Sequence, residues 1–326
     1  ISDLPVHAGK LIWDAVDLVV LTALIAVSIA AARARPLARS DWRTALMLVF
    51  PVGLLLYPVM NDLQLGQINL VLVLMIVADL VVGVSWRGKR LPPGVLTGLA
   101  AALKLTPLVF VPYLLATRQW RAARNMVLTF IAATGLMFVV APRASWSYFT
   151  KDAYDVTRVG NELSIGNQTL KASVLRTHLP LPHSLVDLVL VLMVGGGIAL
   201  AALAYRRSSP MLGVLLCAAT GLMVSPISWN HHYVWIVPAL VWLVAGVDRP
   251  AGGIVWAAAA ALVFMWSPGV PPADSNVIWY LRENAYVFAT LVFFASVGAM
   301  LWARRRRPAP TPSGVHAQGI RGSTAS

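Results

Sequence analysis

The chain has 326 residues, of which 58% are hydrophobic and 12% are charged, whereas a soluble domain carries about 25% charged residues. Its net charge is +13, but the basic residues form short clusters between apolar runs. That pattern is typical of the cytoplasmic loops of membrane proteins and not of a nucleic-acid-binding surface. The composition therefore excludes a soluble domain and a nucleic-acid partner, and predicts an all-α, polytopic integral membrane protein whose partner is the lipid bilayer.

In chain order, we expect about nine full membrane spans, since apolar runs near the length of a bilayer core recur along the chain. The positive-inside rule places the basic clusters beside them in the cytoplasm, which predicts a multi-pass protein of the plasma membrane. Residues 1–307 then form one transmembrane domain, and the Pro/Ser/Gly-rich residues 308–326 form a disordered cytoplasmic tail. The expected spans are 11–32, 44–60, 68–85, 126–141, 186–204, 210–225, 233–246, 252–268 and 285–303.

Residues 91–117 do not fit a simple crossing, because basic clusters flank the segment on both sides. Lys104 and Pro107 lie in its middle; proline breaks a helix, and an ionisable group at membrane depth needs a polar cavity. We therefore predict a re-entrant helical hairpin, which is allowed where protein buries the irregular backbone. The alternative is a single kinked span with one exception to the charge rule.

This topology places nearly all polar residues that resemble a site outside the cytoplasm. The predicted site therefore lies on the extracytoplasmic face. The residues concerned are Asp62, Gln64, Gln67, Glu162, Asn167, Gln168, Asn230, His231, His232, Asp274 and Glu283.

The stretch NDLQLGQIN, residues 61–69, carries Gln67 and Asn69 into the first turn of a span. Their amides suit sugar hydroxyls or a lipid head group, but composition alone favours ordinary polar capping of a helix start. Lys104 is suited to neutralise a phosphate. The alternatives are a structural ion pair with Asp79 or Asp17, or a lysine that snorkels to the interface.

Two candidates for binding, Asn167 and Gln168, lie in the long loop 142–185, unless that loop is only a solvated connection.

The stretch SPISWNHHYVW, residues 225–235, places Asn230, His231 and His232 between aromatic residues. Adjacent helical residues point about 100° apart, so the two histidines are a poor metal pair and no metal site is predicted. One histidine could contact a phosphate or a sugar while the other packs. On these residues alone, a lipid-substrate enzyme and a transporter both fit.

Four stretches of the sequence, taken together, indicate a protein family. They are LGQINLVLVL (65–74), GLAAALKLTPLVFVPYLL (98–115), GNQTLKASVLR (166–176) and SPISWNHHYVW (225–235). In this order and spacing they resemble the actinobacterial polyprenyl-phosphate-mannose-dependent α-1,2-mannosyltransferases of glycosyltransferase family 87, which have the GT-C membrane fold. The enzymes that extend phosphatidylinositol mannosides are nearest in character. Lipomannan-branching mannosyltransferases and arabinofuranosyltransferases look similar.

The resemblance implies a polyprenyl-phosphate sugar donor, a glycolipid or lipoglycan acceptor in the outer leaflet, and inversion at the anomeric carbon. It implies no cofactor and no required metal. By position it gives one of the two histidines, His231 or His232, beside Asn230, a contact with the donor phosphate or sugar. It matches the other candidates to the family's polar elements, namely Gln67, Asn69, Lys104, Asn167 and Gln168.

The resemblance also places the catalytic aspartate of the family in a first outer loop that would precede Ile1. We therefore expect the chain to lack that loop and its span, and to be inactive alone. Asp62 or Glu162 would be the substitute base if the chain were complete. A transporter or flippase of a lipid-linked sugar, or an arabinofuranosyltransferase of the same family, is the alternative function.

Overall fold

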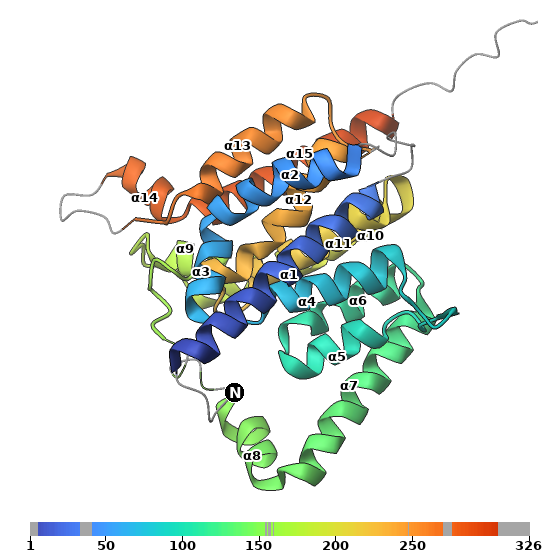
Figure 1. The fold of residues 1–326 in the computed structure, drawn as a ribbon. Helices are drawn as coiled ribbons and strands as arrows, with labels where there is room; N and C mark the ends of the chain where they lie inside the picture. The colour runs from blue at the N-terminus through green and yellow to red at the C-terminus, as the bar shows by residue number, and fades with distance from the viewer. Residues whose placement is uncertain are drawn as a thin grey trace, which may run out of the picture.

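The computed structural model describes residues 6–32, 41–153, 155, 158, 160–246, 248–269 and 276–305. The tail 308–326, Asp274 and the residues before Val6 lie outside them. Helices make up most of the described chain (Figure 1). The helices longer than one or two turns are α1 (Val6–Ala32), α2 (Asp41–Leu55), α3 (Tyr57–Leu65), α4 (Asn69–Val77), α5 (Val95–Leu103), α7 (Trp120–Val140), α10 (His183–Arg207), α11 (Pro210–Val224), α12 (Ile236–Ala245), α13 (Gly253–Met265) and α15 (Ala285–Arg305).

Shorter elements connect these helices. A two-stranded antiparallel ladder pairs β1 with β2 between α4 and α5. The connecting elements are η1 (Ala78–Val82), β1 (Ser85–Trp86), β2 (Lys89–Arg90), η2 (Thr106–Val109), α6 (Phe110–Ala116), α8 (Pro142–Ser147), η3 (Tyr148–Asp152), α9 (Leu170–Leu175), η5 (Asn230–Trp235) and α14 (Val277–Glu283).

Four of the described helices are long and apolar enough to cross a membrane, namely α1, α7, α10 and α15. The pair formed by α3 and residues 69–82 would be a fifth span, bent by 119° at its break. Helices α11, α12 and α13 are shorter, with 10 to 15 residues each. The expected all-α architecture of apolar helices is confirmed, and the count of nine full spans stays a prediction.

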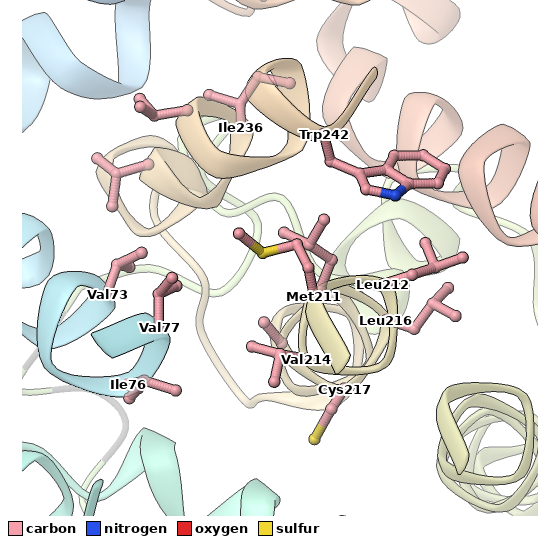
Figure 2. Close-up of a cluster of buried hydrophobic side chains, with 14 of the residues drawn as sticks. Val73, Ile76, Val77, Met211, Leu212, Val214, Leu216, Cys217, Ile236 and Trp242 are labelled. Atoms are coloured by element: carbon pink, nitrogen blue, oxygen red, sulfur yellow. The ribbon is translucent and has the colours of Figure 1, made fainter. Parts of the chain in front are cut away.

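Helix α11 forms the centre of the packed core. Its sequence is apolar all round, which suits a helix enclosed on every side, and almost all of its side chains are buried. Pro210 occupies its first turn, and the hydroxyl of Ser209 accepts a hydrogen bond from the Leu212 amide, so its N-terminus is capped. Figure 2 shows side chains of α4 and α12, including Val73 and Trp242, gathered around this helix.

Residues 91–117 fold into a helical hairpin. Helix α5 enters and ends at Leu103, Lys104 has extended backbone, and η2 and α6 return. A Cβ on Gly94 would meet the Ala122 carbonyl at 2.1 Å, and one on Gly98 would meet the Met126 carbonyl at 2.4 Å. The start of α5 therefore lies against the start of α7, which follows α6 directly. Both ends of residues 91–117 therefore lie on the same side of the molecule, as the basic clusters on either side of this segment predict.

The two ends of the molecule differ in character. We call the end with α9, α14 and η5 the outer end, and the end with β1–β2 and the last turns of α10 and α15 the basic end; they lie on opposite sides in Figure 1. At the basic end, Arg206 donates a 2.6 Å hydrogen bond to the Ala116 carbonyl, and Arg304 donates one of 2.6 Å to the Asp248 carbonyl. The basic clusters thus serve as helix-end contacts as well as topology signals.

The two-ended arrangement predicts which loops a membrane-impermeant maleimide reaches in intact cells. In a Cys217→Ala background, which removes the buried cysteine, we expect Pro180→Cys at the outer end to be labelled. Lys89→Cys at the basic end should be labelled only after lysis, because the positive-inside rule predicts that this end faces the cytoplasm. Equal labelling of both positions in intact cells would contradict the assignment.

The hairpin also predicts a packing requirement at Gly98. The change Gly98→Val should lower the free energy of unfolding by about 1–3 kcal/mol, because its side chain would push α5 away from the α7 backbone. Gly135→Val, on the open face of α7, should have little effect because no other atom lies within 4 Å of a Cβ there. Thermal unfolding of both variants in detergent measures the difference, and equal melting temperatures would refute the packing.

Candidate functional site

The site begins at the break between α3 and α4. Helix α3 ends at Leu65 and is capped by Gly66, whose φ of 60° lies in the left-handed region that glycine adopts without strain. The resulting turn brings Asp62 and Asn69 together. The Asn69 amide nitrogen donates to Asp62 Oδ1 at 2.6 Å, and the Leu70 amide donates to Oδ2 at 3.4 Å. Asp62 is fully buried, so these contacts fix the orientation of Asn69.

Lys104 reaches this pair from the break in the hairpin. Its ammonium donates to Asn69 Oδ1 at 2.8 Å and to His232 Nε2 at 3.0 Å. We call Asp62, Asn69, Lys104 and His232 the Lys104 cluster. An ammonium has three hydrogens, and no acceptor for the third is found among the residues that the structure describes. The cluster thus offers a cation with a free donor at a helix break.

The two histidines come from η5, a 3₁₀ turn that places them differently. His231 Nδ1 lies 3.2 Å from Asn61 Oδ1, while His232 faces Lys104. Their rings meet edge to face with centroids 4.8 Å apart. Burial, helped by the charge of Lys104, lowers the pKa of His231 to about 4, and it lowers the pKa of His232 as well.

Both imidazoles are therefore neutral near pH 7, because their pKa values lie below it. The Lys104 ammonium can only donate, so Nε2 of His232 must accept and the ring proton sits on Nδ1. His232 can then donate from Nδ1 to an anion while its other nitrogen positions the ammonium. This pairing of a cation with a neutral donor suits a phosphate oxygen.

Asn167 and Gln168 lie outside the Lys104 cluster, and their side chains bind backbone. The amide nitrogen of Asn167 donates to the Glu162 carbonyl at 2.9 Å, and its oxygen accepts from the Ser228 amide at 3.0 Å. Gln168 donates to the carbonyls of Ile165 and Glu283 at 2.7 and 2.6 Å. Both residues are fully buried. They hold the outer loop against the segment that leads into His231 and His232.

The remaining predicted residues lie apart from the cluster or beside it. Glu162 forms an ion pair with Lys171 at 3.2 Å. Gln67 is partly exposed, and none of the hydrogen bonds described involves its side chain. Asn230 is buried, and within the described residues its side-chain oxygen has no partner. Asn230 therefore remains a binding candidate on structural grounds.

The proposed ion pair of Lys104 with Asp79 is not formed. Asp79 instead accepts hydrogen bonds from the amides of Gly94 and Thr97 at 3.0 and 2.8 Å, which caps the start of α5. This carboxylate at a helix N-terminus also suits the helix dipole. Its role is to anchor the hairpin.

Sequence reasoning missed a polar stripe on α1. Lys10, Trp13, Asp14 and Asp17 recur at the spacing of one helix face in an otherwise apolar helix, and that period was the available signal. Asp17 is fully buried, and both of its carboxyl oxygens lack a partner among the described residues. Lys10, at the start of the stripe, donates to the Leu63 carbonyl of α3 at 3.4 Å. The stripe therefore extends the polar site toward α1.

A cavity of about 50 Å³ lies beside the cluster. Asn69 and His232 line its polar part, while Val73, Phe110 and Trp235 line its apolar part. It therefore combines a polar end beside the Lys104 cluster with an apolar wall. Among the described residues, no group of three or more histidine, cysteine or acidic side chains is placed to hold a metal ion.

Comparison with known proteins identifies relatives of the chain. Residues 1–226 match the family model of glycosyltransferase family 87. The chain is 32% identical over 292 residues to a polyprenol-phosphate-mannose-dependent α-(1-2)-phosphatidylinositol mannoside mannosyltransferase of Mycobacterium tuberculosis, covering 82% of this chain and 66% of that protein. It is 30% identical over 324 residues to a corresponding phosphatidylinositol pentamannoside mannosyltransferase of Mycolicibacterium smegmatis. That match covers 93% of this chain and 73% of that protein.

A second Mycolicibacterium smegmatis protein, named like the Mycobacterium tuberculosis one, is 33% identical over 279 residues and is covered to 59% of its length. The chain thus spans less than two thirds of two of these relatives. No solved structure matches it.

The geometry predicts different outcomes for Gln168 and Gln67. Gln168→Ala should leave buried backbone groups of the outer loop unpaired, at a cost of about 1–3 kcal/mol for each group. We expect a lower melting temperature in detergent. Gln67→Ala should leave the melting temperature unchanged, because none of the described hydrogen bonds depends on its side chain. A stable Gln168→Ala protein would contradict the supporting role.

Proposed function

Since this chain belongs to glycosyltransferase family 87, we propose that it transfers a mannosyl group from polyprenol-phosphate-mannose to a phosphatidylinositol mannoside. The new bond would be an α-(1→2) linkage made with inversion. The observation that carries the proposal is the contact of the Lys104 ammonium with neutral His232 at the polar end of an apolar cavity. The printed names of the relatives supply the donor and the acceptor class.

The leaving group in this reaction is a lipid phosphate, and the Lys104 cluster suits it. Negative charge grows on the bridging phosphate oxygen as its bond to the sugar breaks. A preorganised ammonium and an Nδ1–H donor would stabilise that charge without needing to rearrange. The Asp62–Asn69 pair would hold the ammonium in place, which makes these two residues positioning residues.

The proposed step is a single in-line displacement. The acceptor hydroxyl attacks the anomeric carbon from the face opposite the phosphate, the new carbon–oxygen bond forms, and the phosphate leaves with the electron pair of the old bond. The hydroxyl proton passes to a carboxylate general base. The family resemblance gives that role to an acidic residue of a first outer loop. Because both oxygens of Asp62 accept hydrogen bonds, we assign Asp62 to positioning rather than to proton transfer.

We place this reaction at the outer surface of the plasma membrane. The break between α3 and α4, the loop with Asn167 and η5 all belong to the outer end, and the basic clusters belong to the opposite end. The transporter alternative gains no support from the relatives, whose names describe transferases.

The proposal predicts the effect of removing the phosphate contacts. In membranes that contain the full-length protein, radiolabel from polyprenol-phosphate-mannose should move into extracted phosphatidylinositol mannosides. Lys104→Met and His232→Ala should each lower the turnover at least about tenfold, which corresponds to about 1.4 kcal/mol of barrier. His231→Ala should act in the same direction, through its contacts with His232 and Asn61.

His183→Ala is the matched control, since His183 is an exposed histidine at the start of α10. Wild-type turnover in both Lys104→Met and His232→Ala would refute the assigned site. Absence of transfer by folded wild-type protein would refute the donor, and a polyprenyl-phosphate arabinofuranose donor would be tested next.

A further inference from the structure

A cavity of about 740 Å³ lies at the outer end, and no member of the Lys104 cluster lines it. We call it the outer cavity. Its walls come from the end of α9, from α14 and from the loop at residues 163–165 (Figure 1). Ligand sites in proteins have volumes of about 300–1,000 Å³, so the outer cavity has the size of a site for a small ligand.

Hydrogen bonds hold the walls of the outer cavity together. The Tyr280 hydroxyl of α14 donates to the Ser173 carbonyl of α9 at 3.0 Å. Arg176, at the end of α9, donates from Nε to the Asn284 side-chain oxygen at 3.1 Å and from a terminal nitrogen to the Ser164 carbonyl at 3.0 Å. Arg176 itself is buried. The outer cavity is therefore preformed and does not need a ligand to assemble it.

Glu283 brings a carboxylate to this cavity from the end of α14. The residue is only 8% exposed, yet its Oε1 accepts a single long hydrogen bond, of 3.4 Å, from the Asn284 side chain. None of the hydrogen bonds among the described residues involves its Oε2. A carboxylate that has lost most of its hydration needs donors in return. The hydroxyl groups of a ligand in the cavity would supply them.

The lining also offers a donor and an apolar surface. The side-chain oxygen of Asn276 accepts from the Ile278 and Trp279 amides at 3.0 and 3.4 Å, which caps α14 and leaves the NH₂ group to donate. Leu179 and Val277 add apolar wall. A hydroxyl both donates and accepts, so a carboxylate together with an amide NH₂ suits neighbouring hydroxyls. A sugar ring presents such hydroxyls together with apolar C–H faces.

The charges of the lining argue against a phosphate in this cavity. Arg176 is the only arginine or lysine in the lining, and it already donates four hydrogen bonds within the protein. The carboxylate of Glu283 would repel an anion. The outer cavity thus differs from the Lys104 cluster, which has a free cationic donor. Its chemistry favours an uncharged ligand rich in hydroxyls.

We propose that the outer cavity is a carbohydrate subsite, which holds mannosyl residues of the acceptor that do not react. The proposal rests on the proposed function, which supplies the mannoside. The location suits it, because Gln168 binds the Glu283 carbonyl and its neighbour Asn167 binds the Ser228 amide, just before η5. A glycan in the outer cavity therefore lies on the same face as His232. It adds affinity for longer acceptors without taking part in the displacement.

Direct binding tests the subsite apart from catalysis. The full-length protein in detergent is titrated with α-(1→2)-linked mannotetraose, which has neither lipid nor phosphate, and the heat is measured. Glu283→Gln removes a charged acceptor while keeping its shape, and Val277→Trp fills the rim at a position that is 72% exposed. We expect each change to raise the Kd about tenfold or more, because hydrogen bonds to charged groups are the stronger ones.

The matched control is Ile278→Trp, since Ile278 is 73% exposed on the same helix and does not line the cavity. It should change the Kd less than about twofold, as surface substitutions usually do. If Glu283→Gln does not fold, the comparison of Val277→Trp with Ile278→Trp is decisive alone. Folded wild-type protein that does not bind mannotetraose would overturn the proposal, and so would equal binding by Val277→Trp and Ile278→Trp.

Transfer kinetics then connect the subsite to the acceptor. Initial rates are measured with a phosphatidylinositol pentamannoside and with octyl α-mannoside, which has one sugar. Val277→Trp should raise the KM for the pentamannoside about tenfold and that for octyl mannoside less than about twofold, with kcat unchanged, as loss of uniform binding predicts. An equal effect on both acceptors would overturn the proposal. Failure of the proposed function is distinct, since wild-type protein would then bind mannotetraose but transfer mannose to neither acceptor.

Discussion

The partly buried ammonium of Lys104 is the constraint on which the rest of the site depends. A charge removed from water costs several kcal/mol unless polar groups replace its hydration. Here the replacement comes from an amide oxygen of Asn69 and an imidazole nitrogen of His232, not from a direct ion pair. Asp62 stands one hydrogen bond further away and orients Asn69. Because no carboxylate among the described residues contacts the ammonium directly, its charge remains available to an anionic ligand.

This arrangement requires two interrupted helices that face each other. The α3–α4 break supplies Asp62 and Asn69, and the α5–η2 break supplies Lys104. Breaks leave backbone groups unpaired, which is tolerated at membrane depth only where protein surrounds them. Each break accordingly has local support. Gly66 allows the left-handed turn after α3, and Asp79 caps α5 so that the hairpin stays against α7.

The outer loops act as a second layer of support. Arg176 donates to the side chain of Asn284 and to the carbonyls of Ser164 and Asn167, and Gln168 connects the same loop to Glu283. The amide of Ser228 is held by Asn167, only a few residues before the histidines. A network of this kind, in which buried polar groups satisfy each other, restricts η5 to one position. Such restriction is what a phosphate site needs, because its donors must be in place before the charge develops.

The sequence by itself determined the apolar helices, the position of the hairpin and the two-ended distribution of charge. Each of these follows from a local property, namely the length of an apolar run, a proline beside a lysine, or the placement of basic residues. The resemblance carried by four stretches also determined the family. Only the tertiary structure decided which polar residues meet. It brought Lys104 into contact with His232 across 128 positions of the chain, and it paired the side chains of Asn167 and Gln168 with backbone groups. It also buried Asp17, whose carboxyl oxygens have no partner among the described residues. A side chain's local sequence does not encode its distant neighbours, so contacts of that kind arise only when the helices pack.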